Sequence, residues 1–423
     1  MCGIAGIFLI DKKKYYLKID LIKRMNEIQS HRGPDASGVW MSSDRNIAFG
    51  HSRLSIIDLS IKANQPFQDL TRDYTITFNG EIYNHSEIRK RLIQKGYKFK
   101  TKNSDTEVLL LSYIEWKKDC LKYIKGMFAF AIWDNNEQSL WLVRDRVGVK
   151  PLYYKIDRNK IFFASEIKAI LLDETYNAKI DEESLFHYLS FLCSPSPNTM
   201  FEGIKKLDAG CWLSIDRKGK VVKKQYWDPI KNKESFRKNE NDFNDLIYNQ
   251  IKKSVKLRSI SDVEVGIFLS GGIDSSTNAS LFAELSKKRI NTFSIGYDKE
   301  YDSYKSELNY AKLVSQKIGS NHHEKKLSKK DLIDIIEKMV YHQDEPISDP
   351  VCFPIYFVSK LARDNGVKVC QVGEGADELF FGYTNWARTS LINNVLKKPF
   401  FISPIKKILK KAMEILSIDY KYS

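Results

Sequence analysis

One stretch, residues 265–276 with the sequence VGIFLSGGIDSS, constrains the fold of this chain more than any other. An apolar run typical of a buried strand passes into a Ser/Gly turn, and the turn passes into a helix. Adjacent glycines let the backbone approach a ligand closely, and a turn followed by a helix N-terminus aims N–H groups at an anion. The stretch therefore predicts a phosphate-binding loop, with candidate ligand-binding residues Ser270, Gly271, Gly272, Ser275 and Ser276.

The same loop carries an acidic residue, Asp274. A carboxylate repels a phosphate unless a cation lies between them, so Asp274 is a candidate Mg²⁺ ligand. The loop is not of the Walker A type, because no Gly-Lys-Ser/Thr follows the glycines.

The segments around this loop alternate between helical and strand patterns. We expect helices at 243–258 and 276–287 and strands at 263–269 and 292–295. A further helix and strands near 368–372 are expected to follow. Alternation of this kind predicts βαβ units and a parallel sheet. Residues 242–423 are thus expected to form an α/β domain.

The first two hundred residues follow a different pattern. Strands are expected at 45–55 and 74–78, the second ending in a turn at Asn79-Gly80, with helices at 86–95 and 105–116. Short strands with few helices indicate two packed sheets with helices outside. A polar, charged stretch at residues 216–241 is the expected linker, which gives a first domain of residues 2–215.

Composition excludes several classes of protein. The net charge is +15, but the positive charge is mostly Lys, 52 against 16 Arg, and is scattered along the chain. No aromatic-basic motif accompanies it, so we expect no nucleic-acid partner. No apolar run approaches the ~20 residues of a transmembrane helix, and no secretory signal begins the chain, which makes the cytoplasm the expected location. The six cysteines form no CxxC pair or Cys/His cluster that would indicate zinc or a disulfide framework.

The position of Cys2 is chemically distinctive. The small residues after Met1 permit its removal, and Cys2 would then carry both a thiol and a free α-amino group. That amine, with a usual pKa near ~8, can accept the thiol proton and later return it to a leaving ammonia. Cys2 is therefore a candidate nucleophile that needs no separate histidine base.

Other residues of the first domain suit a free amino acid substrate. Arg53, on a strand, could hold a carboxylate, and Asp105, at an expected helix N-cap, could hold an ammonium group. The Asn79 amide and the Gly80 N–H could polarise a carbonyl and stabilise its oxyanion. The structural alternatives for these residues are strand-end packing, a hairpin turn and a helix cap.

The motifs MCGIAGIF, HRGPD, RLSIIDLS, NGEIYN, SDTE, GMFAFAIWD and RDRVGVKPLYY occur in this order between residue 2 and about residue 212. They resemble the class II glutaminase domain of glutamine-dependent asparagine synthetases. The resemblance implies the α+β N-terminal-nucleophile fold, a four-layer αββα sandwich. It further implies Cys2 as nucleophile and Arg53 on the glutamine carboxylate. Asn79 and Gly80 match the oxyanion donors that contact glutamine, and Glu81 and Asp105 match further glutamine-contacting positions. RDRVGVKPLYY is interpreted as a structural turn and core segment.

The second half resembles the rest of that family. SGGIDSS is similar to the pyrophosphate loop of the ATP pyrophosphatase fold, which implies an α/β parallel-sheet domain that binds ATP. FSIGY and QVGEGADELFFGY match two further segments. The resemblance implies that Glu374 assists adenylation of a carboxylate and that Asp377 joins Asp274 on Mg²⁺. It also implies ATP contacts from Leu269, Ile295, Val372 and Gly373.

Some features depart from the commonest family pattern. Val372 replaces a usual Ser or Thr, and Phe381 replaces the first Gly of a usual GGY. DEPISDP, which includes Asp344 and Glu345, resembles the family's substrate-side loop, although solvated turn residues are an equal alternative. Because the chain ends at Ser423, we expect the second domain to be incomplete at its C-terminus. Residues 405–416 predict an amphipathic terminal helix with a basic face.

The sequence thus predicts a glutamine-hydrolysing, ATP- and Mg²⁺-dependent amidation of a carboxylate through an acyl-AMP intermediate. Aspartate is the first expected acceptor and asparagine the product, and a homodimer is a possible assembly. Two alternatives remain open. One is the same chemistry on another carboxylate, such as a sugar acid of surface-polysaccharide synthesis. The other is a truncated paralogue with glutaminase or binding activity only.

Overall fold

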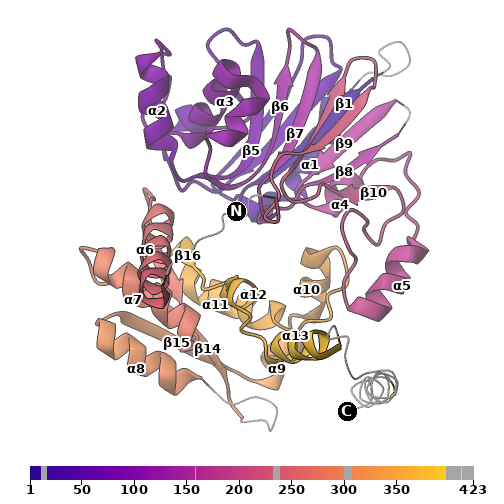
Figure 1. Ribbon diagram of the computed structural model, residues 1–423. Coiled ribbons are helices and arrows are strands. Elements are labelled where there is room, and N and C mark those ends of the chain that lie inside the picture. The colour runs from indigo at the N-terminus through magenta and orange to yellow at the C-terminus, as the bar shows by residue number, and fades with distance from the viewer. Residues whose placement is uncertain (11–16, 158, 232–238, 300–306, 397–410, 412–423) are drawn as a thin grey trace.

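The computed structural model describes residues 1–10, 17–157, 159–231, 239–299, 307–396 and 411, and Figure 1 gives the arrangement of its helices and strands. Among these residues, no helix is both long and apolar enough to cross a membrane. The expected amphipathic helix at 405–416 lies, apart from Lys411, outside the described residues.

The first half of the chain forms two six-stranded antiparallel sheets. One has the order β10 (Ile204–Lys206), β8 (Tyr153–Ile156), β9 (Lys160–Ala164), β1 (Gly3–Leu9), β3 (Ile47–Arg53) and β2 (Ala36–Met41). The other has the order β12 (Val221–Gln225), β11 (Cys211–Asp216), β7 (Ser139–Arg144), β6 (Gly126–Asp134), β5 (Tyr74–Ile82) and β4 (Phe67–Gln68).

Successive side chains of these strands point to opposite faces of each sheet. They form three hydrophobic clusters, one between the two sheets and one on each outer face. Phe8 and Phe49 of the first sheet meet Trp133 of the second between the two sheets. The outer face of the second sheet packs on α2 (His85–Gln94) and α3 (Asp105–Trp116). The outer face of the first sheet packs on α1 (Ile19–Glu27) and α4 (Ile167–Ile170). The order helix, sheet, sheet, helix confirms the expected αββα sandwich.

The second half contains a four-stranded parallel sheet, in the order β15 (Asn321–Leu327), β14 (Asn291–Tyr297), β13 (Val265–Phe268), β16 (Val369–Gln371). Helices α6 (Glu240–Arg258), α7 (Ile273–Leu285) and α8 (Leu308–Ile318) contribute to a core with β13. Helix α11 (Cys352–Asp364) packs against Phe293 in a separate cluster. A parallel sheet with helices around it confirms the expected α/β domain.

Shorter elements complete the described chain. They are the 3-10 helices η1 (Ser30–Arg32), η2 (Ile61–Ala63) and η3 (Lys117–Lys122), and the α-helices α5 (Glu182–Phe191), α9 (Lys329–Ile333), α10 (Ile336–Gln343), α12 (Ala376–Phe380) and α13 (Thr384–Leu396).

Three local expectations are corrected. Asn79 and Gly80 lie within β5 and not at a turn, because the strand pairs with β6 along its whole length, to Ile82. Sheet pairing thus outweighs the local Asn-Gly turn signal. The N-cap of α3 is Ser104, whose hydroxyl accepts from Glu107 N at 3.4 Å, and Asp105 is the first helical residue. Strand β12 lies inside the stretch 216–241 that composition indicates as a linker, and it extends the second sheet.

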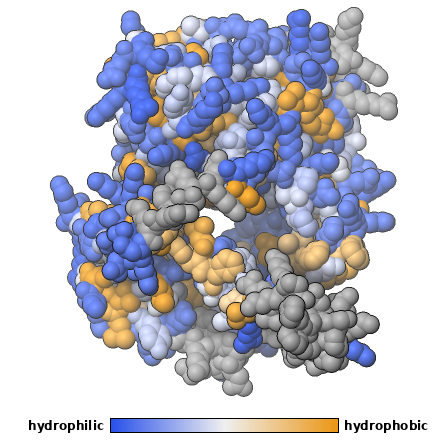
Figure 2. All heavy atoms as spheres, viewed as in Figure 1, coloured by the Kyte–Doolittle hydropathy of each residue, from blue (hydrophilic) through white to orange (hydrophobic). Residues whose placement is uncertain are grey.

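The two halves contact each other directly, and the N-terminus lies between them (Figure 1). Polar residues cover most of the face in Figure 2, which is hollowed between the halves. Beside the start of the chain, Lys368 pairs with Asp35 at 3.0 Å, and the Asp58 N–H donates to Asp262 at 2.8 Å.

Candidate active sites

The predicted residues of the first half line one cavity of about 270 Å³. Cys2 lies immediately before β1, and its Sγ accepts a hydrogen bond from Leu54 N at 3.4 Å. The Cys2 carbonyl accepts from Arg32 Nε at 3.0 Å. Both the thiol and the backbone of Cys2 are therefore held. Lys368, Val369 and Cys370 of the second half close part of the cavity wall.

Arg53 ends β3 with its guanidinium in the cavity wall. It donates to the Ser60 carbonyl at 3.0 Å, to the Asn64 amide oxygen at 2.7 Å, and to the Asp58 carbonyl. None of these acceptors is a carboxylate, so the cation is fixed in place while its charge stays available. A fixed guanidinium of this kind can bind the carboxylate of an incoming ligand.

Asn79 supplies an unused donor to the same cavity. The residue is 1% exposed, and its Nδ2 has no hydrogen-bond partner among the residues that the structure describes. Buried amide donors are rarely left unpaired in native proteins. Gly80, the next residue of β5, also lines the cavity. Asn79 therefore has the position and the free donor that an oxyanion site requires.

Glu81 and Asp105 form a pair of buried carboxyl groups beside these donors. Burial and the neighbouring Asp105 raise the pKa of Glu81 to about 7. Burial also raises the pKa of Asp105, although its carboxylate accepts from Ile82 N at 3.0 Å. An ammonium group bound here would relieve the repulsion between the two carboxyl groups.

Two amines lie close to the nucleophile. Burial lowers the pKa of the Met1 α-amino group to about 6, and burial raises the pKa of the Cys2 thiol. Lys150 lines the cavity, and its ammonium donates to the Met1 sulfur at 2.6 Å. Burial lowers the pKa of Lys150 to about 8.

Sequence reasoning missed Lys150, because it lies in RDRVGVKPLYY, which is interpreted as structural. The rest of that segment supports the interpretation. Arg144 donates to the carbonyls of Lys150, Leu207 and Gly148 at 2.8–2.9 Å, and Asp145 accepts from the backbone around them. The segment carries other charged residues besides Lys150, so no local signal singled out this lysine.

The predicted phosphate loop follows β13 and begins α7. Gly271 has φ +95°, and a Cβ there would lie 2.6 Å from Ala311 N, so both conformation and space require glycine. The Ser270 and Ser275 hydroxyls bond each other at 2.9 Å, and the Gly272 N–H donates to Ser270 at 3.2 Å. Ser276 Oγ is buried without a partner among the described residues. The loop therefore has a hydroxyl donor at the N-terminus of α7 that is unpaired within the described part of the chain.

The loop after β16 lies beside this loop. A Cβ on Gly373 would be 2.8 Å from Ser275 N, so the two backbones are in contact. From β13 the chain passes to β14 and then β15 on one side, and it later returns to place β16 on the other side of β13. Ligands of parallel α/β sheets bind at such a switch point, outside the carboxyl ends of the strands.

Four acidic residues lie near this switch point: Asp274, Glu374, Asp377 and Glu378. Burial, with the charges of Glu378, Asp274 and Asp377, raises the pKa of Glu374. The described residues contain no cluster of three His, Cys, Asp or Glu side chains in metal-binding geometry. Two aspartates with phosphate oxygens are nevertheless a donor set that suits Mg²⁺.

The remaining predicted nucleotide residues differ in exposure. The Leu269 side chain is 1% exposed within the hydrophobic core, so only its backbone could meet a ligand. Ile295 is half-buried at the end of β14, and Val372 is exposed. Phe381 has φ +57°, a left-handed conformation that glycine adopts more easily, as the family's usual residue would.

The side chains of Asp344 and Glu345 are largely removed from solvent, at 8% and 11% exposed. Asp344 pairs with Lys168 of the first half at 2.8 Å, and Glu345 pairs with Lys206 at 3.1 Å. This loop therefore docks one half of the chain on the other, and its two acidic residues are not the solvated turn residues of the alternative interpretation.

Comparisons with known proteins agree with this division. Residues 1–227 match the Glutamine amidotransferase domain family, and residues 246–414 match the Asparagine synthase family. The glutamine-hydrolysing asparagine synthetase 1 of Bacillus subtilis is 38% identical over 98% of this chain and 62% of its own length. A putative glutamine-hydrolysing asparagine synthetase 2 of Methanocaldococcus jannaschii is 36% identical over 97% of this chain and 82% of its own. The chain thus spans under two thirds of the length of the Bacillus relative.

Similarity to solved structures is weaker. Glutamine phosphoribosylpyrophosphate amidotransferase of Bacillus subtilis is 14% identical with a TM-score of 0.40, covering 88% of this chain and 91% of that one. The NH3-dependent NAD synthetase of Campylobacter jejuni is 19% identical with a TM-score of 0.24, covering 34% of this chain and 61% of that one.

Proposed function

Since this chain belongs to the family of glutamine-dependent asparagine synthetases, we propose that it hydrolyses glutamine at Cys2 and uses the ammonia to amidate a carboxylate with ATP. The observation that carries this proposal is the cavity around Cys2. It combines a nucleophile, a fixed cation in Arg53, a free donor in Asn79 and a carboxyl pair. A free amino acid with a side-chain amide fits each of these groups.

The chemistry of the first half follows from those groups. Removal of Met1 gives Cys2 a free amine, which accepts the thiol proton as sulfur attacks the glutamine amide carbon. Arg53 binds the α-carboxylate, and Glu81 with Asp105 binds the α-ammonium. Asn79 Nδ2 and the Gly80 N–H stabilise the oxyanion. Ammonia then leaves with the returned proton, and water hydrolyses the thioester to glutamate.

In the second half, the loops after β13 and β16 would hold ATP. The donors are Ser270, Ser275, Ser276 and the backbone of Gly271, Gly272, Val372 and Gly373, with further contacts from Ile295 and the Leu269 backbone. Asp274 and Asp377 would hold Mg²⁺, which supplies positive charge to the phosphates. Glu374 would face the carboxylate, whose oxygen attacks the α-phosphate of ATP to give an acyl-AMP and release pyrophosphate. Ammonia then attacks the acyl carbon and displaces AMP to leave the amide.

Strand β16 supports a link between the two reactions. Its residues Val369 and Cys370 line the Cys2 cavity, and Gly373 contacts the phosphate loop. Ammonia released at Cys2 would thus start beside the strand that leads to Glu374. Because β12 belongs to the second sheet, we propose that the first of two domains extends through β12 and that the linker follows it.

The acceptor is proposed from the names of the relatives, which makes aspartate the first choice and asparagine the product. A sugar acid stays an alternative, as does a chain with glutaminase activity alone. Acceptors should be screened by AMP formation, because an acyl-AMP mechanism releases AMP only with the correct carboxylate.

One experiment tests the whole proposal. AMP and amide formation are measured with glutamine and then with an ammonium salt, in the natural chain and in Cys2→Ala. The variant should lose glutamine-dependent turnover and keep ammonia-dependent turnover. If the natural chain forms no AMP with either nitrogen source and any screened acceptor, the ligase proposal is wrong and only the glutaminase proposal remains.

A further inference from the structure

A carboxylate from the second half caps a helix of the first half. Asp344 accepts from Ile167 N at 2.7 Å, at the start of α4, and pairs with Lys168 at 2.8 Å. Glu166, the N-cap residue of α4, makes no capping bond with its own side chain. Asp344 also has φ +61°, which non-glycine residues rarely adopt. The loop after α10 is therefore held in an uncommon conformation that delivers this carboxylate.

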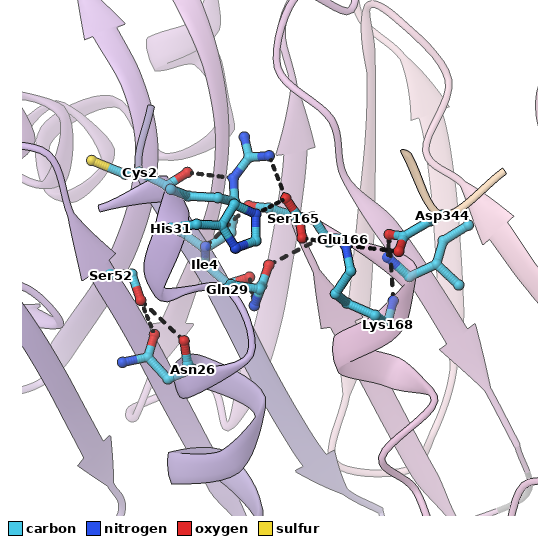
Figure 3. Close-up of polar contacts among 12 residues, drawn as sticks. Cys2, Ile4, Asn26, Gln29, His31, Ser52, Ser165, Glu166, Lys168 and Asp344 are labelled. Atoms are coloured by element: carbon cyan, nitrogen blue, oxygen red, sulfur yellow. Dashed lines mark hydrogen bonds and ion pairs between the residues drawn. The ribbon is translucent and has the colours of Figure 1, made fainter. Parts of the chain in front are cut away.

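From Lys168 the polar contacts continue toward the nucleophile, as Figure 3 shows. Lys168 donates to one carboxylate oxygen of Glu166 at 2.6 Å. The other oxygen accepts from Arg32 at 3.0 Å and contacts His31 Nε2 at 2.8 Å. Arg32 in turn donates to the Cys2 carbonyl at 3.0 Å. Charges alternate along this series, which we call the Asp344–Cys2 relay (Asp344, Lys168, Glu166, Arg32, Cys2).

The relay is largely removed from water. The side chains of Asp344, Lys168 and Glu166 are each 8% exposed. Burial alone would raise the pKa of Glu166, but hydrogen bonds from His31 and Lys168 and the charge of Arg32 hold it at about 2. In such surroundings a charge that loses its partner is strongly destabilised, so removing one member of the relay is costly for its neighbours.

The backbone around Cys2 is bonded to the same turn. Ser165, next to Glu166, bonds both polar groups of Ile4, at 3.0 Å through its hydroxyl and at 2.9 Å through its N–H. Gln29 accepts from Glu166 N at 3.1 Å and donates to the Ile4 carbonyl at 3.4 Å. A displacement of the Glu166 turn would therefore displace the start of β1, where Cys2 lies.

We propose that Asp344, Lys168 and Glu166 are positioning residues for Cys2, so that docking of the second half sets the geometry of glutamine hydrolysis. This inference rests on the proposed role of Cys2 as the glutaminase nucleophile. The position of a nucleophile is a sensitive quantity, since a misplacement of about 1 Å can reduce turnover about 100-fold. The relay thereby ties hydrolysis to the presence of the domain that would use the ammonia.

The chain offers a matched control. Glu345, adjacent to Asp344, forms a second, partly exposed ion pair between the halves, with Lys206 at 3.1 Å, and accepts from Met200 N at 2.9 Å. None of these contacts leads to Cys2. Glu345→Gln therefore weakens docking of the same loop without touching the relay.

The experiment compares Lys168→Met, Asp344→Asn and Glu345→Gln in the full chain. Glutamate release is measured with glutamine alone, without ATP or acceptor. The two relay variants should lose about ten- to 100-fold in kcat with KM changed less than about twofold, because glutamine is held by other residues. Glu345→Gln should stay within about twofold of the natural chain. Lys168→Arg should recover part of the loss, and the double relay variant should be no slower than the slower single one.

A second measurement separates this inference from the proposed function. The rate at which iodoacetamide alkylates Cys2, followed by mass on the N-terminal peptide, reports thiol position without glutamine turnover. If the natural chain releases glutamate but no AMP, the ligase proposal alone fails. If it releases no glutamate, the alkylation rates decide. The inference is overturned if the relay variants match the natural chain in glutamate release or, where no glutamate is released, in the rate of Cys2 alkylation. It is also overturned if Glu345→Gln lowers that same rate as much as the relay variants do. Asp344→Asn, which keeps an acceptor for α4, decides if Lys168→Met does not fold.

Discussion

The two candidate sites of this protein depend on different physical properties. The Cys2 cavity gathers buried charged groups from distant parts of the chain, and burial moves the pKa of Glu81 to about 7 and of Lys150 to about 8. The phosphate loop gathers backbone groups at the ends of two neighbouring parallel strands, at Gly271 and Gly373. The first site should therefore respond most to changes in charge and donors, and the second to changes in backbone space.

The largest effect is expected from Asn79→Ala. Loss of one oxyanion donor should lower the kcat of glutamine hydrolysis about 10²- to 10³-fold. Steady-state glutamate release measures this, and ammonia-dependent AMP formation should be unchanged as the control. A loss of less than about threefold would remove Asn79 from the oxyanion site.

Gly373→Ala should damage the other site. The new Cβ would lie 2.8 Å from Ser275 N, so one of the two loops must shift. We expect ammonia-dependent AMP formation to fall about ten- to 100-fold. Glutamate release should not change. If glutamate release fell as much as AMP formation, the two sites would not differ in the proposed way. The result would show that glutamine hydrolysis also depends on the space around the backbone near β16.

The pH dependence of kcat/KM for glutamine tests the charge side of the comparison. Because the pKa of Glu81 is raised to about 7, the carboxyl group loses its negative charge as the pH falls through 7. The attraction for the glutamine ammonium then weakens, so kcat/KM should fall below pH 7. Glu81→Gln should show a less steep acid limb and a few-fold lower value at pH 8. Glu81→Asp should keep the limb, and an unchanged limb in Glu81→Gln would exclude this role.

The smallest effect is expected from Lys368→Met. This residue pairs with Asp35 across the two halves at 3.0 Å, with side chains 45% and 24% exposed. Exposed ion pairs contribute little, so the free energy of unfolding should change by less than about 1 kcal/mol. Denaturant unfolding measures it. A larger change in the free energy of unfolding would show that this exposed ion pair stabilises the interface between the halves as strongly as a buried ion pair does.

Much of the fold could be predicted from local patterns. The αββα sandwich followed from short strands with few helices together with the family motifs, and the α/β domain followed from alternation around 265–276. These features depend on periodicity and turn residues, which neighbouring positions encode. The expected turn at Asn79-Gly80 was wrong because long-range pairing with β6 decided the conformation there.

The candidate sites were predictable in part for the same reason. The motifs predicted Cys2, Arg53, Asn79 and Asp105, and the structure brings them into one cavity. Lys150 was missed because no local pattern says which way a lysine after a turn will point. The Leu269 side chain, expected beside a nucleotide, is buried in the core instead.

The sequence by itself determined the two kinds of domain, the phosphate loop and the chemistry available at Cys2, because each is written in consecutive or regularly spaced residues. The tertiary structure alone decided that Asp344 caps a helix 177 residues away and that β16 borders the Cys2 cavity. In both contacts the two partners are far apart in the sequence, so no local stretch of sequence contains both of them. Only the folded chain brings them together and pairs the polar groups that folding has buried.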